Sequence, residues 1–291
     1  CYIRPARLFI SGGKEIQSQE GTTQGDPVAM GMYALGLMPL LIAVTLITSD
    51  IVQVAFADDI TGVGKITDLK KWWDAINKLG PHLGYYIKAD KSWLIVKEKH
   101  LELAKTTFHG SEIKITTDGR RHLGAVVGSL SNKEKFINEK VESWVGEVRK
   151  LSEIARTEPH AAFSSFVHGV RHKFKFIMRT VPDISNLLNP LDQEIDRFIM
   201  VLMQGYCFND TERLLFSLPP KLGGLGIIIP SAISDREYSN SKQLTSTLKT
   251  AVITQHLENN TDDNKSTNEI KANIRKAKQF GTLSEYDTTS L

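Results

Sequence analysis

The chain has 291 residues, a formal net charge of +3, 41% hydrophobic residues and 24% charged residues. These values are typical of a soluble globular protein, and the length allows two compact units with separate cores. The small positive charge is compatible with a polyanionic partner but does not require one. The two cysteines, Cys1 and Cys207, are too few for a disulfide framework or a structural zinc site. We therefore expect an intracellular, reducing compartment, either cytoplasm or nucleus.

The first 130 residues alternate predicted hairpins and helices. Leu8–Ile10 and Lys14–Gln17 flank a Ser-Gly-Gly turn and predict a hairpin. Asp50–Lys65 predicts a strand, a turn and a second strand, and the helical spacing within Asp68–Gly84 predicts a helix that ends at the Gly-Pro pair. Further short strands are expected within Ser92–Lys97, Ile113–Thr117 and His122–Gly128. This order indicates an α+β unit, an antiparallel sheet with helices on one face.

One apolar segment is long enough to cross a bilayer. Pro27–Ser49 contains no charged residue. Pro39 lies near its middle, and the flanking residues Asp26 and Asp50 are not the Lys or Arg that orient spanning helices. We therefore expect a helix buried on all sides at the centre of a domain, with no membrane partner. The alternative is a membrane protein with a single span at Val28–Thr48.

The pattern becomes helical after Ser131. Apolar residues recur at steps of three and four and predict an amphipathic helix that contains Ile137, Val141, Trp144, Val148, Leu151 and Ala155. Two more helices are expected, from His160 to about Met178 and from Asn189 to Gly205. The turn-rich segment "LPPKLGGLGIIIP" and a weakly amphipathic helix follow. The predicted division is therefore a sheet unit at 1–130, a helical unit at 131–206, a connection at 207–257 and a polar, flexible tail at 258–291.

The stretch "VAFADDITGVGK", Val54 to Lys65, places two adjacent aspartates at the end of an apolar run. Neighbouring carboxylates repel each other unless water surrounds them or a cation lies between them. The pair is therefore either a solvated turn or a divalent metal site. The residues of this stretch alone favour neither interpretation.

Four motifs in a fixed order favour the metal site. The chain has "QGDP" at Gln24–Pro27, "FADD" at Phe56–Asp59, a lysine-bearing turn at Lys91 and "LG" at Leu123–Gly124. This order resembles the palm of reverse transcriptases, in which a Gln-Gly-Asp/Ser-Pro bend, a Tyr/Phe-Ala-Asp-Asp hairpin, a lysine turn and a Leu-Gly strand follow one another. "LPPKLGGLGI" resembles the segment after the thumb in non-LTR retrotransposon polymerases. The resemblance covers about residues 1–230.

The resemblance implies a partial polymerase palm followed by an all-helical, thumb-like unit. It also implies an RNA-directed DNA polymerase that extends a DNA or RNA primer 3′-OH with dNTPs on an RNA template. Such enzymes use two metal ions about 3.5–4 Å apart. Mg²⁺, or Mn²⁺ in its place, prefers hard carboxylate oxygens. By resemblance Asp58 is the principal ligand, and Asp59 is the second ligand.

The resemblance assigns roles to further residues. Lys91 would face the triphosphate, and Leu123 with Gly124 would grip the primer. Lys91 is also explained as an exposed surface lysine, and Lys88 replaces the asparagine that is usual in the family. The implied nucleotide- and template-binding residues are Gln24, Gly25, Asp26, Pro27, Phe56 and Ala57. Asp26 is also explained as a helix cap.

The second predicted helix mixes cations with aromatic residues in "VHGVRHKFKFIMR". Such a mixture suits a thumb that follows a phosphate backbone. A solvated basic face over a phenylalanine core explains the same string equally well. The candidate backbone contacts are Arg171, Lys173, Lys175 and Arg179.

The resemblance requires one more carboxylate, on a strand before "QGDP". The acidic residues before Gln24 are Glu15 and Glu20, and neither lies in an apolar strand of the expected pattern. The chain also opens on Cys1 without a methionine or a signal pattern. We therefore expect a fragment that lacks the fingers and the first half of the palm of its parent protein, and that is inactive alone. The main alternative is a non-catalytic polymerase relic that binds nucleic acid.

Overall fold

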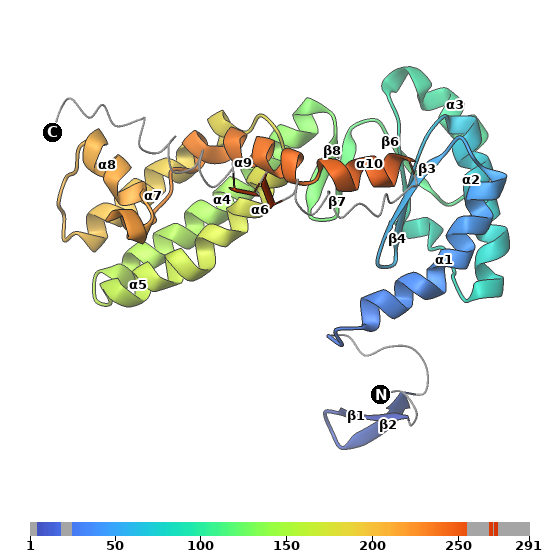
Figure 1. The fold of residues 1–291 in the computed structure, drawn as a ribbon, viewed down its shortest axis with the longest axis horizontal. Coiled ribbons are helices and arrows are strands. Elements are labelled where there is room, and N and C mark those ends of the chain that lie inside the picture. Colours follow the sequence, from blue (N-terminus) through green and yellow to red (C-terminus); the bar gives the residue numbers. More distant parts are fainter. Residues whose placement is uncertain (1–4, 19–24, 255–267, 270, 273–291) are drawn as a thin grey trace. The chain divides into compact units, whose positions relative to one another are not determined.

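The structure is a computed structural model that describes residues 5–18, 25–254, 268–269 and 271–272. The chain divides into two compact units, Cys1–Thr116 and Thr117–Leu291. Both units contain helices and short strands (Figure 1), which confirms the predicted α+β class. Each unit is described by itself.

The first unit contains three strand pairs and three α-helices among its described residues. In chain order its elements are β1 (Ala6–Ile10), β2 (Lys14–Ser18), α1 (Ala29–Ile47), β3 (Val52–Phe56), β4 (Asp59–Val63), α2 (Ile66–Leu79), the 3₁₀ turns η1 (Gly80–Leu83) and η2 (Ala89–Lys91), β5 (Trp93–Ile95), η3 (Glu98–His100), α3 (Leu101–Thr107) and β6 (Lys114–Thr116). The predicted hairpins β1–β2 and β3–β4 are both present.

The strands of this unit do not join into the single antiparallel sheet that we expected. β1–β2 and β3–β4 are separate antiparallel pairs, and β5–β6 is a parallel pair. The parallel arrangement requires a crossover connection, which η3 and α3 provide. Within the described residues, the sheet structure is therefore a set of two-stranded ladders.

The core of the first unit forms where α1, α2 and the β3–β4 hairpin meet. Leu40 and Val44 of α1 lie in one buried cluster with Trp72 and Ile76 of α2. Gly62 of β4 permits this packing, because a Cβ atom there would lie 3.1 Å from the Trp72 ring. The amphipathic spacing of apolar residues in α2 thus predicts the buried face of this helix correctly.

The prediction of a helix buried on all sides is wrong for α1. Only Leu37, Leu40 and Val44 of its 19 residues are buried, whereas Leu35 is 67% exposed and Leu46 82% exposed. Among the described residues α1 is the one helix that is long and apolar enough to cross a membrane, with a mean hydropathy of 2.1. The uniform apolar composition predicted a helix with neighbours on every side, but the described elements pack against one side only.

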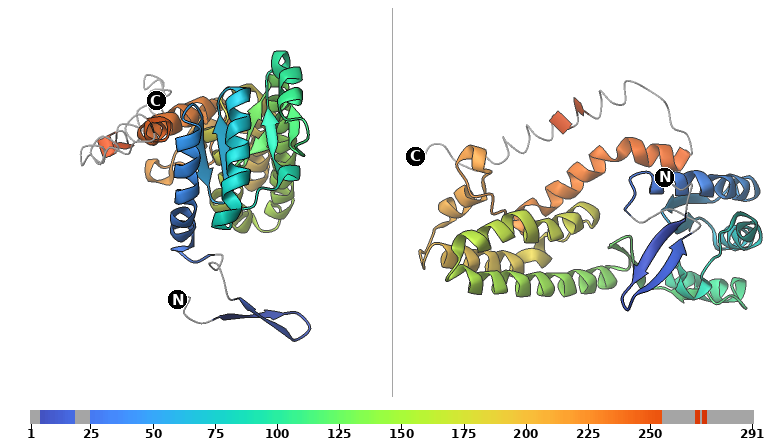
Figure 2. Two further views of the ribbon diagram at one scale, coloured as in Figure 1. Left: turned by 90° about the vertical axis from the view of Figure 1, so that its right-hand side faces the viewer. Right: turned by 90° about the horizontal axis from the view of Figure 1, so that it is seen from below.

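The second unit is a helical bundle preceded by a hairpin. Its elements are β7 (Gly119–His122), β8 (Ala125–Gly128), α4 (Leu130–Ala155), α5 (Pro159–Ser165), the π-helix η4 (Phe166–Val170), α6 (Arg171–Thr180), η5 (Ser185–Leu188), α7 (Asn189–Leu202), α8 (Asp210–Ser217), η6 (Pro220–Leu222), α9 (Pro230–Leu244) and α10 (Ser246–Thr254). α4 packs against α7 and α6 packs against α9 (Figure 2).

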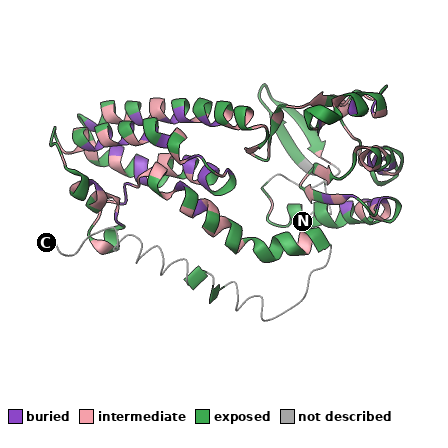
Figure 3. Cartoon of the chain, turned by 90° about the horizontal axis from the view of Figure 1, so that it is seen from above, coloured by how far each residue is buried: buried purple, intermediate pink, exposed green. Residues whose placement is uncertain are grey.

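The predicted helices of this unit are confirmed. Of the six apolar residues that define the helical spacing of α4, five are buried and Leu151 is half-buried. The helix expected from His160 to about Met178 is α5, η4 and α6 in succession, with one π-helical segment. Buried residues lie on the sides of the helices that face each other (Figure 3).

The predicted strand at His122–Gly128 is instead the second half of a hairpin. β7 and β8 pair from Gly119↔Gly128 to His122↔Ala125, and Leu123 and Gly124 form the turn. Both turn residues have positive φ, 45° and 84°, as in the hairpin turns whose twist matches that of the strands. The sequence pattern missed this turn because leucine rarely adopts a positive φ.

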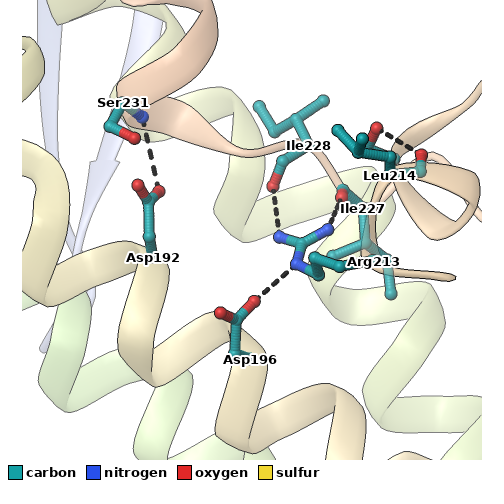
Figure 4. A network of polar contacts seen from close by, with 8 residues as sticks. Asp192, Asp196, Arg213, Leu214, Ile227, Ile228 and Ser231 are labelled. Atoms are coloured by element: carbon teal, nitrogen blue, oxygen red, sulfur yellow. Dashed lines mark hydrogen bonds and ion pairs between the residues drawn. The ribbon is translucent and has the colours of Figure 1, made fainter. Parts of the chain in front are cut away.

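A network of polar contacts fixes the segment after α8. Arg213 of α8 donates to the main-chain oxygens of Ile227, 2.8 Å away, and Ile228, 3.1 Å away, and pairs with Asp196 of α7 (Figure 4). Helix α8 itself was not predicted. Its signal is the capping box of Asn209 and Glu212, which is visible in "NDTE".

Candidate metal site

The two adjacent aspartates lie at the tip of the β3–β4 hairpin. Ala57 and Asp58 form a two-residue turn, and Asp59 begins β4 opposite Phe56. Ala57 has a φ of 53°, a left-handed conformation that costs a non-glycine residue about 1–2 kcal/mol. Both aspartate residues are exposed to solvent.

Buried and exposed side chains alternate along β3, and this alternation explains how the hairpin is attached to the helices. Gln53 is buried, whereas Val54 and Phe56 are exposed, so one face of the hairpin packs on the helices and the other does not. The Gln53 amide nitrogen donates to the Leu41 main-chain oxygen at 2.7 Å and to the Thr45 hydroxyl at 2.6 Å. These bonds attach β3 to α1. They fix the position of the strand along the helix, and therefore the position of the two aspartates at the end of the hairpin.

A tyrosine from another segment holds the turn. The Tyr85 hydroxyl donates a hydrogen bond to the main-chain oxygen of Asp58, 3.1 Å away. Burial, followed by the charges of Tyr33, Asp58 and Asp59, raises the pKa of Tyr85 above its usual 10.0. Burial and the charge of Asp58 likewise raise the pKa of Tyr33. Both hydroxyls are therefore protonated at neutral pH, and that of Tyr85 acts as a donor.

The donor set at the tip fits a hard divalent cation in part. Among the described residues, Asp58 and Asp59 form no ion pair, so no cation of the protein neutralises them there. Mg²⁺ is often held by one or two carboxylates together with waters and substrate phosphates. No group of three or more His, Cys, Asp or Glu residues suited to a metal occurs in the described part of the chain. Within the described residues, the candidate protein ligands at the tip are these two carboxylates.

The "QGDP" motif lies before α1. Gln24 falls outside the described residues. Gly25 has a φ of 92°, which explains the glycine, and Pro27 lies in the turn that leads into the helix. The carboxylate of Asp26 accepts a hydrogen bond from the Val28 main-chain N–H at 2.9 Å, in the turn before the helix. The N-cap residue of α1 is Val28, which has no side-chain capping bond, so the prediction that Asp26 caps the helix is wrong.

Lys91 lies in the 3₁₀ turn η2, just before β5, and is exposed to solvent. Its main-chain N–H donates to the Lys88 oxygen at 3.1 Å, and the Ser92 hydroxyl donates to the same oxygen at 2.9 Å. The turn is thus closed by main-chain contacts that do not require asparagine at position 88. Within the described residues, no hydrogen bond or ion pair joins Lys91 to either aspartate.

The candidate primer-binding residues lie in the second unit. Leu123 is exposed at the tip of the β7–β8 hairpin. The ring of Phe176 on α6 lies close beneath the tip, because a Cβ atom on Gly124 would lie 3.1 Å from it. The hairpin therefore presents a leucine at a tip that rests on the bundle.

The cations of α6 are largely engaged within the protein. Arg171 donates to the Gly226 main-chain oxygen at 3.0 Å. Lys173 pairs with Glu147 at 2.7 Å, and Arg179 pairs with the buried Glu237 at 3.1 Å. Lys175 also has an interaction within the structure. These contacts favour the interpretation of a basic face over a phenylalanine core, since Phe174 is fully buried.

Two residues of the site carry no sequence signal. Gln53 is a polar residue between two valines, a pattern that places the polar residue on the exposed face, whereas the structure buries it. Tyr85 stands next to Tyr86, and only the tertiary structure distinguishes the residue that contacts Asp58 from the one that is 68% exposed.

Comparison with known proteins assigns no family. No protein-family model matches the chain, and no curated protein matches it.

Proposed function

We propose that this chain carries part of the palm and the thumb of an RNA-directed DNA polymerase of a non-LTR-like retrotransposon. The observation that supports this most strongly is the pair of exposed aspartates, Asp58 and Asp59, at the tip of a hairpin whose other end is anchored in the core. The order of the "QGDP", "FADD", lysine and "LG" motifs adds to it. The parent protein would be intracellular and would transfer nucleotides to a primer 3′-OH on an RNA template.

In this proposal Asp58 and Asp59 would hold Mg²⁺ or Mn²⁺, which supplies charge neutralisation for phosphoryl transfer. Asp58, in the turn, is the principal ligand. Two carboxylates are too few for a complete two-metal centre, so a further ligand has to come from the nucleotide phosphates or from another carboxylate of the parent protein. The chain by itself is accordingly expected to bind metal and nucleotide without polymerising.

The experiment is a titration of the 291-residue chain with Mn²⁺ in the presence of a dNTP, whose phosphates complete the ligand set. Free Mn²⁺ is measured by its electron paramagnetic resonance signal. We expect Asp58→Asn to abolish the protein-dependent binding of Mn²⁺. Asp50→Asn, at an exposed aspartate before β3, is the matched control and should bind as the wild type does. Equal binding by the Asp58→Asn variant and the wild type would refute the proposed metal site.

A second candidate function, membrane attachment, is favoured by the exposed apolar surface of α1. Against a span, the side of α1 that carries Leu40 is buried against α2, and the opposite side of α2 bears the ion pair of Lys70 and Asp74. A bilayer around α1 would have to accommodate these charges. In detergent phase separation we expect the chain to remain in the aqueous phase, and partition into the detergent phase would favour the membrane function.

A further inference from the structure

The turn that carries Asp58 is strained, and a hydrogen bond from outside the hairpin holds it. Ala57 adopts a φ of 53° that favours glycine. A strained residue persists where the surrounding structure determines its conformation. A hydrogen bond reaches this turn from another segment of the first unit: the Tyr85 hydroxyl donates to the Asp58 main-chain oxygen, 3.1 Å away.

This contact acts on both carboxylates at once. The main-chain oxygen of Asp58 belongs to the peptide group that joins Asp58 to Asp59. The peptide group is planar, so a bond to its oxygen limits the rotation of the whole plane. This peptide group joins the Cα atoms of both aspartates, so the bond restrains the backbone from which both side chains project.

Contacts within the first unit hold Tyr85 in its position. It follows α2, whose tryptophans lie in the core of the first unit. Its main-chain N–H donates to the Gly80 oxygen at 2.9 Å, and a Cβ atom on Gly80 would lie 2.5 Å from the Tyr85 oxygen, so the turn between the two residues is tight. The ring lines a shallow groove together with Tyr33 and Leu37 of α1. The hydroxyl thus reaches the hairpin from a tight turn that packs beside α1.

We propose that Tyr85 is a positioning residue for the metal site: by holding the Asp58 main-chain oxygen, its hydroxyl sets the geometry in which Asp58 and Asp59 are presented to a divalent cation. The inference rests on the proposed function, because it assumes that the two carboxylates bind metal. Groups that orient metal ligands without touching the metal commonly change metal affinity about 10–100-fold when they are removed.

The experiment compares Tyr85→Phe with Tyr86→Phe in the complete chain. Each substitution removes one hydroxyl and retains the ring, and Tyr86 is 68% exposed. With Mn²⁺ and a dNTP, we expect Tyr85→Phe to weaken Mn²⁺ binding about tenfold. The spectrum of the bound Mn²⁺ should also change, because its ligand geometry is altered. Tyr86→Phe should retain the wild-type affinity and spectrum.

Thermal unfolding of both variants separates positioning from stability. If Tyr85 had a purely structural role, Tyr85→Phe would have a lower melting temperature, but the affinity for Mn²⁺ and the spectrum of bound Mn²⁺ would be those of the wild type. This result would overturn the inference. Wild-type binding by Tyr85→Phe, together with loss of binding in Asp58→Asn, would overturn the inference and leave the proposed metal site intact. Binding that is the same in the wild type and in Asp58→Asn would refute the metal site, and the role of Tyr85 with it.

Discussion

The indole Nε1 of Trp72 donates a hydrogen bond to the side-chain oxygen of Gln53, 3.0 Å away, and both residues are buried. Through the amide nitrogen of the same glutamine, the contact continues to Leu41 and Thr45 of α1. One side chain of β3 therefore connects the strand to both helices that cover it.

Gln53→Leu tests this connection. The substitution leaves the indole N–H of Trp72 buried without an acceptor, which is expected to cost about 1–3 kcal/mol of stability. Urea unfolding followed by tryptophan fluorescence measures the change in the free energy of unfolding. Gln17→Leu, in the exposed strand β2, is the control and should change stability by less than about 0.5 kcal/mol. Equal effects of the two substitutions would show that the network does not stabilise the unit.

Gly128→Ala tests the close approach of β7 and β8. A Cβ atom at this position would lie 2.3 Å from the Asp118 main-chain oxygen and 2.4 Å from the Gly119 Cα atom, at a φ of 146°. We expect a loss of about 1–3 kcal/mol from backbone strain, measured by urea unfolding.

Gly146→Ala is the matched control for that substitution. Gly146 lies within α4, and nothing is within 4 Å of a Cβ atom placed there. Alanine is the better helix former, so this variant is expected to gain about 0.5–1 kcal/mol. Opposite signs of the two changes are the expected result, and a stabilising Gly128→Ala would contradict the geometry of the hairpin.

Asp192 on α7 predicts a pH dependence. Burial raises the pKa of this carboxyl above its ordinary 3.8, although the hydrogen bonds from Ser231 and the charge of Arg213 oppose the shift. Because the folded-state pKa is raised, the contribution of the group to stability is fully present below pH 3.8 and is lost as the pH rises through the folded-state pKa.

Asp192→Asn removes this dependence and keeps an oxygen that accepts the bond from the Ser231 main-chain N–H, which is 3.3 Å long in the wild type. The stability of the variant relative to the wild type should therefore increase as the pH rises from 3 towards neutrality. Melting temperatures across that range measure the difference, and the same substitution at the exposed Asp235 is the control. A difference that does not change with pH would contradict the raised pKa of the partly buried Asp192.

Much of the fold follows from local patterns in the sequence. The spacing of Trp72 and Ile76, and that of Val141 and Val148, predicts helices with the correct buried faces, because helical periodicity places such residues on one side of a helix. The apolar runs before and after the two aspartates predict the β3–β4 hairpin, because a turn between two apolar runs is typical of paired strands. These features depend on neighbours within a few residues.

The environment of α1 shows the limit of such patterns. Its uniform apolar composition indicates burial, but burial depends on which other elements lie against the helix, and in the described structure they cover one side only. The turn at Leu123 was missed for a related reason, since the conformation there is determined by strand pairing and by the contact of Gly124 with Phe176.

Periodicity and turn chemistry along the chain predict most of the long helices, the first two hairpins and the two adjacent carboxylates at a turn, whereas α8 and the β7–β8 hairpin were not predicted. The folded structure was needed to show that Tyr85 rather than Tyr86 contacts Asp58, that Gln53 joins three elements, and that Arg171 and Arg179 have partners within the second unit. Each of these contacts joins residues far apart in the chain, and such pairs are brought together by packing of the core, which local sequence patterns do not encode.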